Sequence, residues 1–348
     1  MPAARRRCPL LGGDTEVFCA SLVEGLAHLE STLEVDGGGG VSMRWCADAM
    51  RLVKRMQREL LAIFRKADVV AAVAAVPGRK GGADERCGWF EQYMQETAAL
   101  LDFCNAFKAA VSRMHRYCMV VDFAAQVGRA GAAAGADNAG GAVVSLVAGI
   151  ADGWASPAAA VVREKLTSVK AAVAEAERLG RTVASSAGGD AGGGMVVVTL
   201  VAKITMAVVS IFVLQALTSR SPLDVADAGS PPAAALGCAV VVPELELWHK
   251  SLSLIHGRFP SRATVVEHEK VSMAVQDLIS GQMDGGGGGG HGDRQDELVR
   301  TNVELLRARS GELREGVEMF DSVLDEVFDE VIRGRNEMLG ILRDKALT

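Results

Sequence analysis

Apolar residues recur every three or four positions along most of the chain, which is the spacing of one face of an α-helix. The alternation of apolar and polar residues that marks a half-buried strand is nearly absent. The last stripe is the clearest, because it keeps one face apolar from Leu298 to Leu342. The pattern predicts amphipathic helices at 14–36, 45–75, 87–127, 156–179, 243–256, 262–283 and 293–348.

Glycine-rich stretches separate these helices. No such stretch follows a strand or ends in GK[ST], as a phosphate-binding loop would, so we interpret them as linkers. The Ala/Gly-rich run at 128–141 is predicted to be a loop, and the alternative is that its alanines extend the preceding helix. The predicted organisation is a disordered N-terminus at 1–13, an N-terminal helical region at 14–184, a Gly-rich linker at 185–194, an apolar helix at 195–217, a connecting region with short helices at 218–284, a Gly linker at 285–292, and a long C-terminal helix at 293–348 that packs on the bundle.

The segment 195–217 is apolar throughout, and Lys203 is its only charged residue. About 20 predominantly apolar residues are enough for a helix to cross the ~30 Å hydrocarbon layer of a membrane. A lysine at mid-bilayer costs about 2.5–3.5 kcal/mol, and the Val, Leu, Ile and Phe residues, at about −0.3 to −0.6 kcal/mol each, outweigh it in sum. A membrane segment is therefore predicted. The residues expected to contact lipid are Val197, Leu200, Val201, Ile204, Val208, Ile211, Phe212 and Leu214.

The same segment has a second interpretation, as the central helix of a soluble bundle. If 14–184 and 262–346 belong to one bundle, a single crossing would place them on opposite sides of the membrane. A segment that enters the membrane and returns through 231–242 avoids this conflict, and so does a core helix. With few prolines and few aromatic residues, the composition favours aliphatic helix packing in either case. The predicted fold class is all-α: an elongated bundle of long amphipathic helices with one strongly apolar central helix.

Charge and cysteine content restrict the function. The chain has 37 Lys and Arg against 43 Asp and Glu, so it lacks the basic balance of a nucleic-acid-binding protein. Its seven cysteines are odd in number and widely spaced, which is typical of reduced intracellular thiols. The N-terminus lacks the apolar run of a secretory signal. With no HExxH, GxSxG or CxxC motif, we expect no enzymatic activity, no catalytic residue, no cofactor or metal, and no small-molecule substrate.

Two of the predicted helices carry charged flanks of opposite sign. Arg51, Arg55 and Arg58 lie on the basic flank of the helix at 45–75 and are candidates for binding a partner. The last helix is acidic, from Glu318 to Glu330. Pairing between the two helices within the chain is the simpler interpretation.

Two motifs resemble those of a known family. The run Tyr93-Met94-Gln95-Glu96-Thr97 followed by LLDFCNAF at 100–107, and VFDEVIRGR at 327–335, are similar to the signatures of the plant BYPASS/ROH-type proteins. The residues that carry the resemblance are Leu101, Asp102, Cys104, Asn105, Phe107, Phe328, Arg333 and Arg335. The resemblance implies a plant helical protein without enzymatic chemistry, associated with developmental signalling or secretion.

The function expected from these observations is that of a non-enzymatic, membrane-associated adaptor that faces the cytoplasm. It would bind protein partners through its helical faces, with membrane lipid as a second partner. The alternative is a soluble cytoplasmic scaffold that binds partner helices and uses the apolar segment as a core helix.

Overall fold

A computed structural model describes residues 13–33, 40–73, 82–133, 191–218, 246–260, 263–283 and 292–346. Within these ranges the chain is all-α, apart from two strands of two residues each, and the predicted fold class is confirmed. The elements are α1 (Gly13–Thr32), β1 (Gly40–Val41), α2 (Met43–Val73), α3 (Gly82–Ala133), α6 (Ala191–Thr218), α8 (Glu246–Arg258), β2 (Thr264–Val265), α9 (Val266–Met283) and α10 (Gly292–Ala346).

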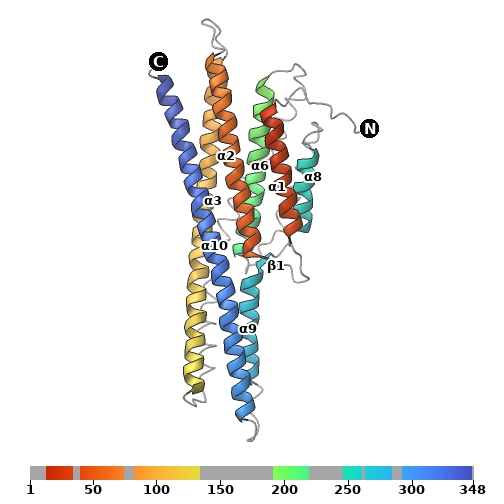
Figure 1. Cartoon of the computed structure of the whole chain (residues 1–348), viewed down its shortest axis with the longest axis vertical. Coiled ribbons are helices and arrows are strands. Elements are labelled where there is room, and N and C mark those ends of the chain that lie inside the picture. The colour runs from red at the N-terminus through yellow and green to blue at the C-terminus, as the bar shows by residue number, and fades with distance from the viewer. Residues whose placement is uncertain are drawn as a thin grey trace, which may run out of the picture.

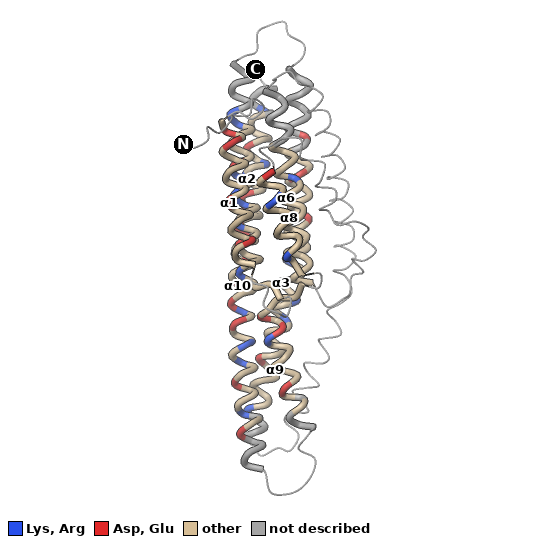
Figure 2. Tube along the Cα trace, turned by 90° about the vertical axis from the view of Figure 1, so that its right-hand side faces the viewer, with Lys and Arg blue, Asp and Glu red and all other residues tan. Residues whose placement is uncertain are grey.

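The two longest helices set the shape of the molecule. Helix α10 has 55 residues and α3 has 52, and they run side by side along almost the whole length of the bundle (Figure 1). At 1.5 Å per residue, a helix of that size is roughly 80 Å long. Helices α1, α2, α6 and α8 lie beside the upper half, and α9 lies beside the lower half. Acidic and basic residues are interspersed along both halves (Figure 2).

The two halves are joined by a short parallel β-pair. Strand β1 precedes α2 and strand β2 precedes α9, with Gly40 opposite Thr264 and Val41 opposite Val265. A Cβ on Gly40 would lie 2.4 Å from a methyl carbon of Val266, so the strands approach closely only with glycine there.

A carboxylate next to the β-pair caps a helix. The Met43 N–H, at the start of α2, donates to both carboxylate oxygens of Glu267, at 3.1 and 3.2 Å. Glu267 belongs to α9, so a side chain of the lower half holds the N-terminus of α2 in the upper half.

Helix α6 lies inside the upper half, in contact with α1, α2, α3 and β2. From Val198 to Thr218 most of its side chains are buried, and they join one core with the apolar stripes of the surrounding helices. Aromatic residues close this core near the junction of the halves. Phe212 stacks on Phe259 at 4.4 Å between ring centroids, and Trp45 lies 5.7 Å from Phe259. The predicted central apolar helix is therefore present.

Several element boundaries differ from the prediction. Helix α3 continues through Ala133, because the alanines that follow Val127 favour a helix, so the first part of the predicted loop at 128–141 is helical. Helix α6 begins at Ala191, so the predicted linker at 185–194 is wrong in its last four residues. Packing of the apolar face offsets the low helix propensity of those glycines. The two short strands were not predicted.

Other predicted segments lie outside the described residues. They are the disordered N-terminus up to residue 12, the helix at 156–179, most of the connecting region before Glu246 and the glycine linker up to residue 291.

Candidate functional site

The two motifs that carry the family resemblance meet at the contact between α3 and α10. The Arg335 guanidinium donates from Nη1 to the Met94 carbonyl oxygen at 2.7 Å and to the Thr97 hydroxyl at 2.8 Å. Thr97 Oγ1 donates in turn to the Tyr93 carbonyl oxygen at 2.8 Å. More than 230 residues of sequence separate Arg335 from these partners. We call Tyr93, Met94, Thr97, Gly334 and Arg335 the motif junction.

Gly334 allows the close approach at the motif junction. A Cβ built on Gly334 would lie 2.2 Å from the hydroxyl oxygen of Tyr93, and the Tyr93 ring packs edge-on against Phe64 at 5.6 Å. The tyrosine therefore cannot move far without losing its contact with α2. Glycine is required at this position because a side chain would not fit. Its backbone conformation, which is that of an ordinary helix, would accept other residues.

We predict that Gly334→Ala lowers the free energy of unfolding by about 1–3 kcal/mol, because the new methyl group collides with the Tyr93 hydroxyl. The double variant Gly334→Ala/Tyr93→Phe lacks that hydroxyl and should recover most of the loss. Urea denaturation followed by circular dichroism measures both values. Equal stabilities for the single and double variants would contradict a steric origin.

The remaining motif residues divide between core and surface. Cys104 and Phe107 are buried, and Phe107 meets Phe320 of α10 edge-on at 6.1 Å between ring centroids. Leu101 is partly buried, while Asp102 and Asn105 are exposed on α3. Phe328 is 40% exposed on α10. Neither Asp102 nor Asn105 interrupts the core, because both side chains lie on the exposed side of α3.

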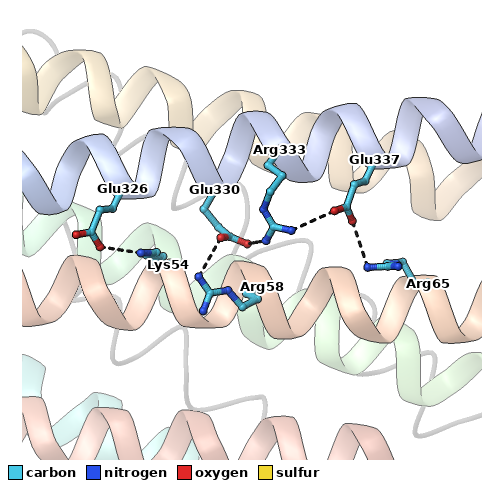
Figure 3. Close-up of polar contacts among 7 residues, drawn as sticks. All are labelled: Lys54, Arg58, Arg65, Glu326, Glu330, Arg333 and Glu337. Atoms are coloured by element: carbon cyan, nitrogen blue, oxygen red, sulfur yellow. Dashed lines mark hydrogen bonds and ion pairs between the residues drawn. The ribbon is translucent and has the colours of Figure 1, made fainter.

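Helices α2 and α10 are joined by a ladder of ion pairs on the outside of the bundle (Figure 3). Lys54 pairs with Glu326 at 2.7 Å, Arg58 with Glu330 at 3.1 Å, and Arg65 with Glu337 at 3.5 Å. The predicted pairing between the basic and acidic flanks is therefore confirmed. Asp321 and Asp325, however, pair with Lys108 of α3 and not with α2.

Glu330 is the one nearly buried carboxylate of this ladder among the described residues. Burial alone would raise the pKa of Glu330, but hydrogen bonds from Arg58 and Arg333 outweigh it and hold the pKa below its ordinary value. Arg333 also reaches Glu337 on its own helix, at 3.1 Å. Arg333, one of the residues that carry the resemblance, thus bridges Glu330 and Glu337, two of the acidic residues of the ladder.

The three arginines expected to bind a partner have contacts within the chain. Arg51 pairs with Asp48 of the same helix at 2.6 Å, Arg55 donates to the Ser21 carbonyl oxygen of α1 at 3.2 Å, and Arg58 belongs to the ladder. These contacts account for the three guanidinium groups without an external ligand.

The apolar helix α6 is held by polar contacts to three different neighbours. The Lys203 ammonium lies 2.7 Å from the Glu96 carboxylate of α3, and the Glu96 side chain is only 8% exposed. The Trp248 indole N–H of α8 donates to the Thr205 hydroxyl at 2.8 Å. The Gln57 amide of α2 lies 3.3 Å from the Met206 sulfur. These three contacts thus reach three separate elements of the bundle.

The residues expected to contact lipid lie on this helix. Leu200 is partly buried, and the buried ones are Val201, Ile204, Val208, Ile211, Phe212 and Leu214. The side chain of Val197 lies outside the described set. By length and composition, the stretch Val198–Thr218 is the one helix in the described part of the chain that could cross a membrane. Glu96, Trp248 and Gln57 were not predicted as partners of this helix, although a lone lysine in an apolar run signals that a buried anion is needed.

Four described cysteines are buried and free: Cys19, Cys46, Cys104 and Cys118. Burial raises the pKa of Cys104 and of Cys118 to about 12, and it also raises the pKa of Cys46, assisted by the nearby charge of Glu267. A thiol with so high a pKa is a poor nucleophile, since the thiolate is the reactive form. Within the described residues there is also no group of three His, Cys, Asp or Glu side chains placed to hold a metal ion.

We predict that Cys46, Cys104 and Cys118 resist iodoacetamide in the folded protein near neutral pH, because almost none of each thiol is ionised and none is accessible. The same residues should react fully in urea. Mass spectrometry of the corresponding peptides before and after unfolding measures this. Rapid labelling of Cys104 in the native protein would contradict the burial described above.

No family model, no curated protein and no solved structure matches this chain.

Proposed function

We propose that this protein is a non-enzymatic helical scaffold that binds partner proteins through its outer faces, with α6 serving as its core helix. The observation that supports this most directly is the set of polar contacts around α6. Lys203, Thr205 and Met206 each meet a side chain from a different neighbouring helix. Such contacts are specific to one arrangement of the bundle, and lipid chains would supply none of them.

The exposed apolar residues of α10 supply a surface for a partner. Phe328, Ile332 and Leu339 are 40%, 36% and 48% exposed, and they follow one another at intervals of four and seven on one side of the helix. This spacing suits a partner helix that lies along α10. We call these three residues the α10 stripe. The resemblance to the BYPASS/ROH-type proteins adds that the partners act in plant developmental signalling or secretion.

Exchanging residues of the α10 stripe tests the scaffold function. The double variant Phe328→Ser/Ile332→Ser should lose the proteins that co-purify with the full chain from plant cells, and should keep its helical circular dichroism. Val17→Ser is a matched control, because Val17 is an exposed apolar residue on α1. Unchanged co-purification with the double variant would rule out the α10 stripe as the binding face.

A second candidate function is the membrane-associated adaptor, which is favoured by the length and composition of Val198–Thr218. Extraction of plant membranes with alkaline carbonate separates the two functions. The scaffold proposal expects the full chain in the soluble fraction, whereas a membrane-spanning α6 would keep it in the carbonate-resistant pellet. If the protein is a scaffold, deleting 195–217 should abolish folding. If it is a membrane-anchored adaptor, the same deletion should release a folded protein from the membrane.

A further inference from the structure

A cavity of about 380 Å³ opens between α3 and α10 in the lower half of the molecule. Helix α3 contributes Asp122, Ala125, Gln126 and Arg129 to its lining, and α10 contributes Arg307 and Arg314. Small-molecule sites in proteins are commonly about 300–1,000 Å³. The cavity is therefore large enough for a small ligand, and its ionisable lining is mostly basic.

The contacts within the chain use these arginines unequally. Arg314 is paired with the Asp122 carboxylate at 2.8 Å, and the other oxygen of that carboxylate accepts from the Ser310 hydroxyl at 2.7 Å. Arg129 reaches Glu304 only at 3.9 Å, and both side chains are half-exposed. Among the ion pairs of the described ranges, none includes Arg307. One guanidinium thus lines the cavity without a carboxylate, and a second is weakly held.

The charge of the lining selects the class of ligand. Three arginines and one aspartate give the cavity a net charge of +2. A phosphate monoester carries about −1.5 to −2 at neutral pH. The planar guanidinium group binds phosphate oxygens through two parallel hydrogen bonds, which a lysine would not provide. A single carboxylate ligand would neutralise only half of the charge.

We propose that this cavity is a binding site for a phosphate monoester group, with Arg307 and Arg129 contacting its oxygens and Arg314 held in place by Asp122. Two sources share this chemistry: a free phosphorylated small molecule and the headgroup of a lipid such as phosphatidic acid. The site is independent of the α10 stripe, because it lies in the other half of the bundle.

A purely structural role makes a different prediction for each arginine. If the cluster only fastens α3 to α10, then Arg314 matters for stability through its pair with Asp122, and Arg307 has no role. If the cluster binds phosphate, Arg307 matters for binding and not for stability. Arg307 is therefore the residue that distinguishes the two roles.

Titration calorimetry of the full chain with inorganic phosphate and with pyrophosphate tests the proposal. The wild type should bind, and Arg307→Ala should bind at least about tenfold more weakly with an unchanged unfolding midpoint. Arg300→Ala is the matched control: Arg300 lies two turns away on the same helix and does not line the cavity, so its affinity should stay within about twofold of the wild type at physiological salt. Absence of binding by the wild type, or equal losses in both variants, would overturn the site.

Sedimentation with vesicles distinguishes the two sources of phosphate. Vesicles of phosphatidylcholine with phosphatidic acid should capture the wild type and not Arg307→Ala if the ligand is a lipid headgroup. Vesicles of the same charge made with phosphatidylserine should capture neither. If only soluble phosphate or pyrophosphate binds, the ligand is a free small molecule. Equal capture by both anionic vesicles and by Arg307→Ala would overturn the proposed site, because the attraction would then be general.

Discussion

Replacing Lys203 by methionine should lower the free energy of unfolding by about 3 kcal/mol. The Glu96 carboxylate is 8% exposed and lies 2.7 Å from the lysine ammonium, so the variant leaves a buried negative charge without this cation. Removing one partner of a buried pair costs far more than the pair contributes on balance, because the remaining charge has lost its solvation by water. Urea denaturation of the purified chain, followed by circular dichroism, gives the value.

A matched control separates burial from charge. Lys66→Met breaks the exposed pair of Lys66 with Asp14, which is also 2.7 Å long, and should cost less than about 1 kcal/mol. The double variant Lys203→Met/Glu96→Gln removes both charges and should recover a large part of the loss. Stability equal to that of the wild type in Lys203→Met would contradict the enclosed position of α6.

The same substitution has the opposite effect on a membrane-spanning helix. Removing a lysine from the apolar run would remove about 2.5–3.5 kcal/mol of insertion cost and would increase retention in the carbonate-resistant pellet. A core helix predicts loss of folded protein and no gain of membrane retention. One variant, measured in both ways, therefore distinguishes the scaffold from the anchored adaptor.

Truncating Phe107 to alanine is expected to cost about 3–5 kcal/mol. Its ring is fully buried, stacks on Phe103 at 6.1 Å and meets Phe320 of α10 edge-on at the same distance. The alanine leaves a cavity at the contact between the two longest helices, and the helices on either side restrict its collapse.

Phe123→Ala is the control for Phe107→Ala, because Phe123 belongs to the same helix and its side chain is 53% exposed. It should cost less than about 1 kcal/mol, since about half of its surface stays in water and its truncation leaves no enclosed cavity. The unfolding midpoint in urea, with the slope held common to both variants, measures the difference. Similar losses for the two phenylalanines would show that the α3–α10 contact is not part of the cooperative core.

The fold class could be predicted because helical periodicity is a local property. Leu22 and Leu26, or Leu313 and Val317, lie one turn apart in sequence and on the same face in space. The contact that pairs Lys54 with Glu326 could be predicted at the level of the two helices, because complementary charge on two long helices favours their contact. Helix boundaries were less predictable, since α6 begins at Ala191 and includes three glycines, which have a low helix propensity.

The candidate site was predicted only in part. The resemblance pointed to Tyr93, Thr97 and Arg335 separately, and no sequence pattern states that Arg335 hydrogen-bonds Thr97 across more than 230 residues. Likewise Lys203 signals a need for an anion without selecting Glu96 from the other carboxylates. The cavity with Arg307 arises from side chains of two antiparallel helices, whose register is fixed only by tertiary packing.

The position of α10 has a consequence for synthesis of the chain. The ladder contacts join residues 272 positions apart, and the motif junction joins residues about 240 apart, so both must wait for the last helix. Until the ribosome releases that helix, α2 and α3 lack the neighbour that covers part of their apolar faces. The nascent polypeptide therefore depends on chaperones to cover its exposed apolar surface late in translation. A premature stop codon before residue 292 should yield a product that aggregates.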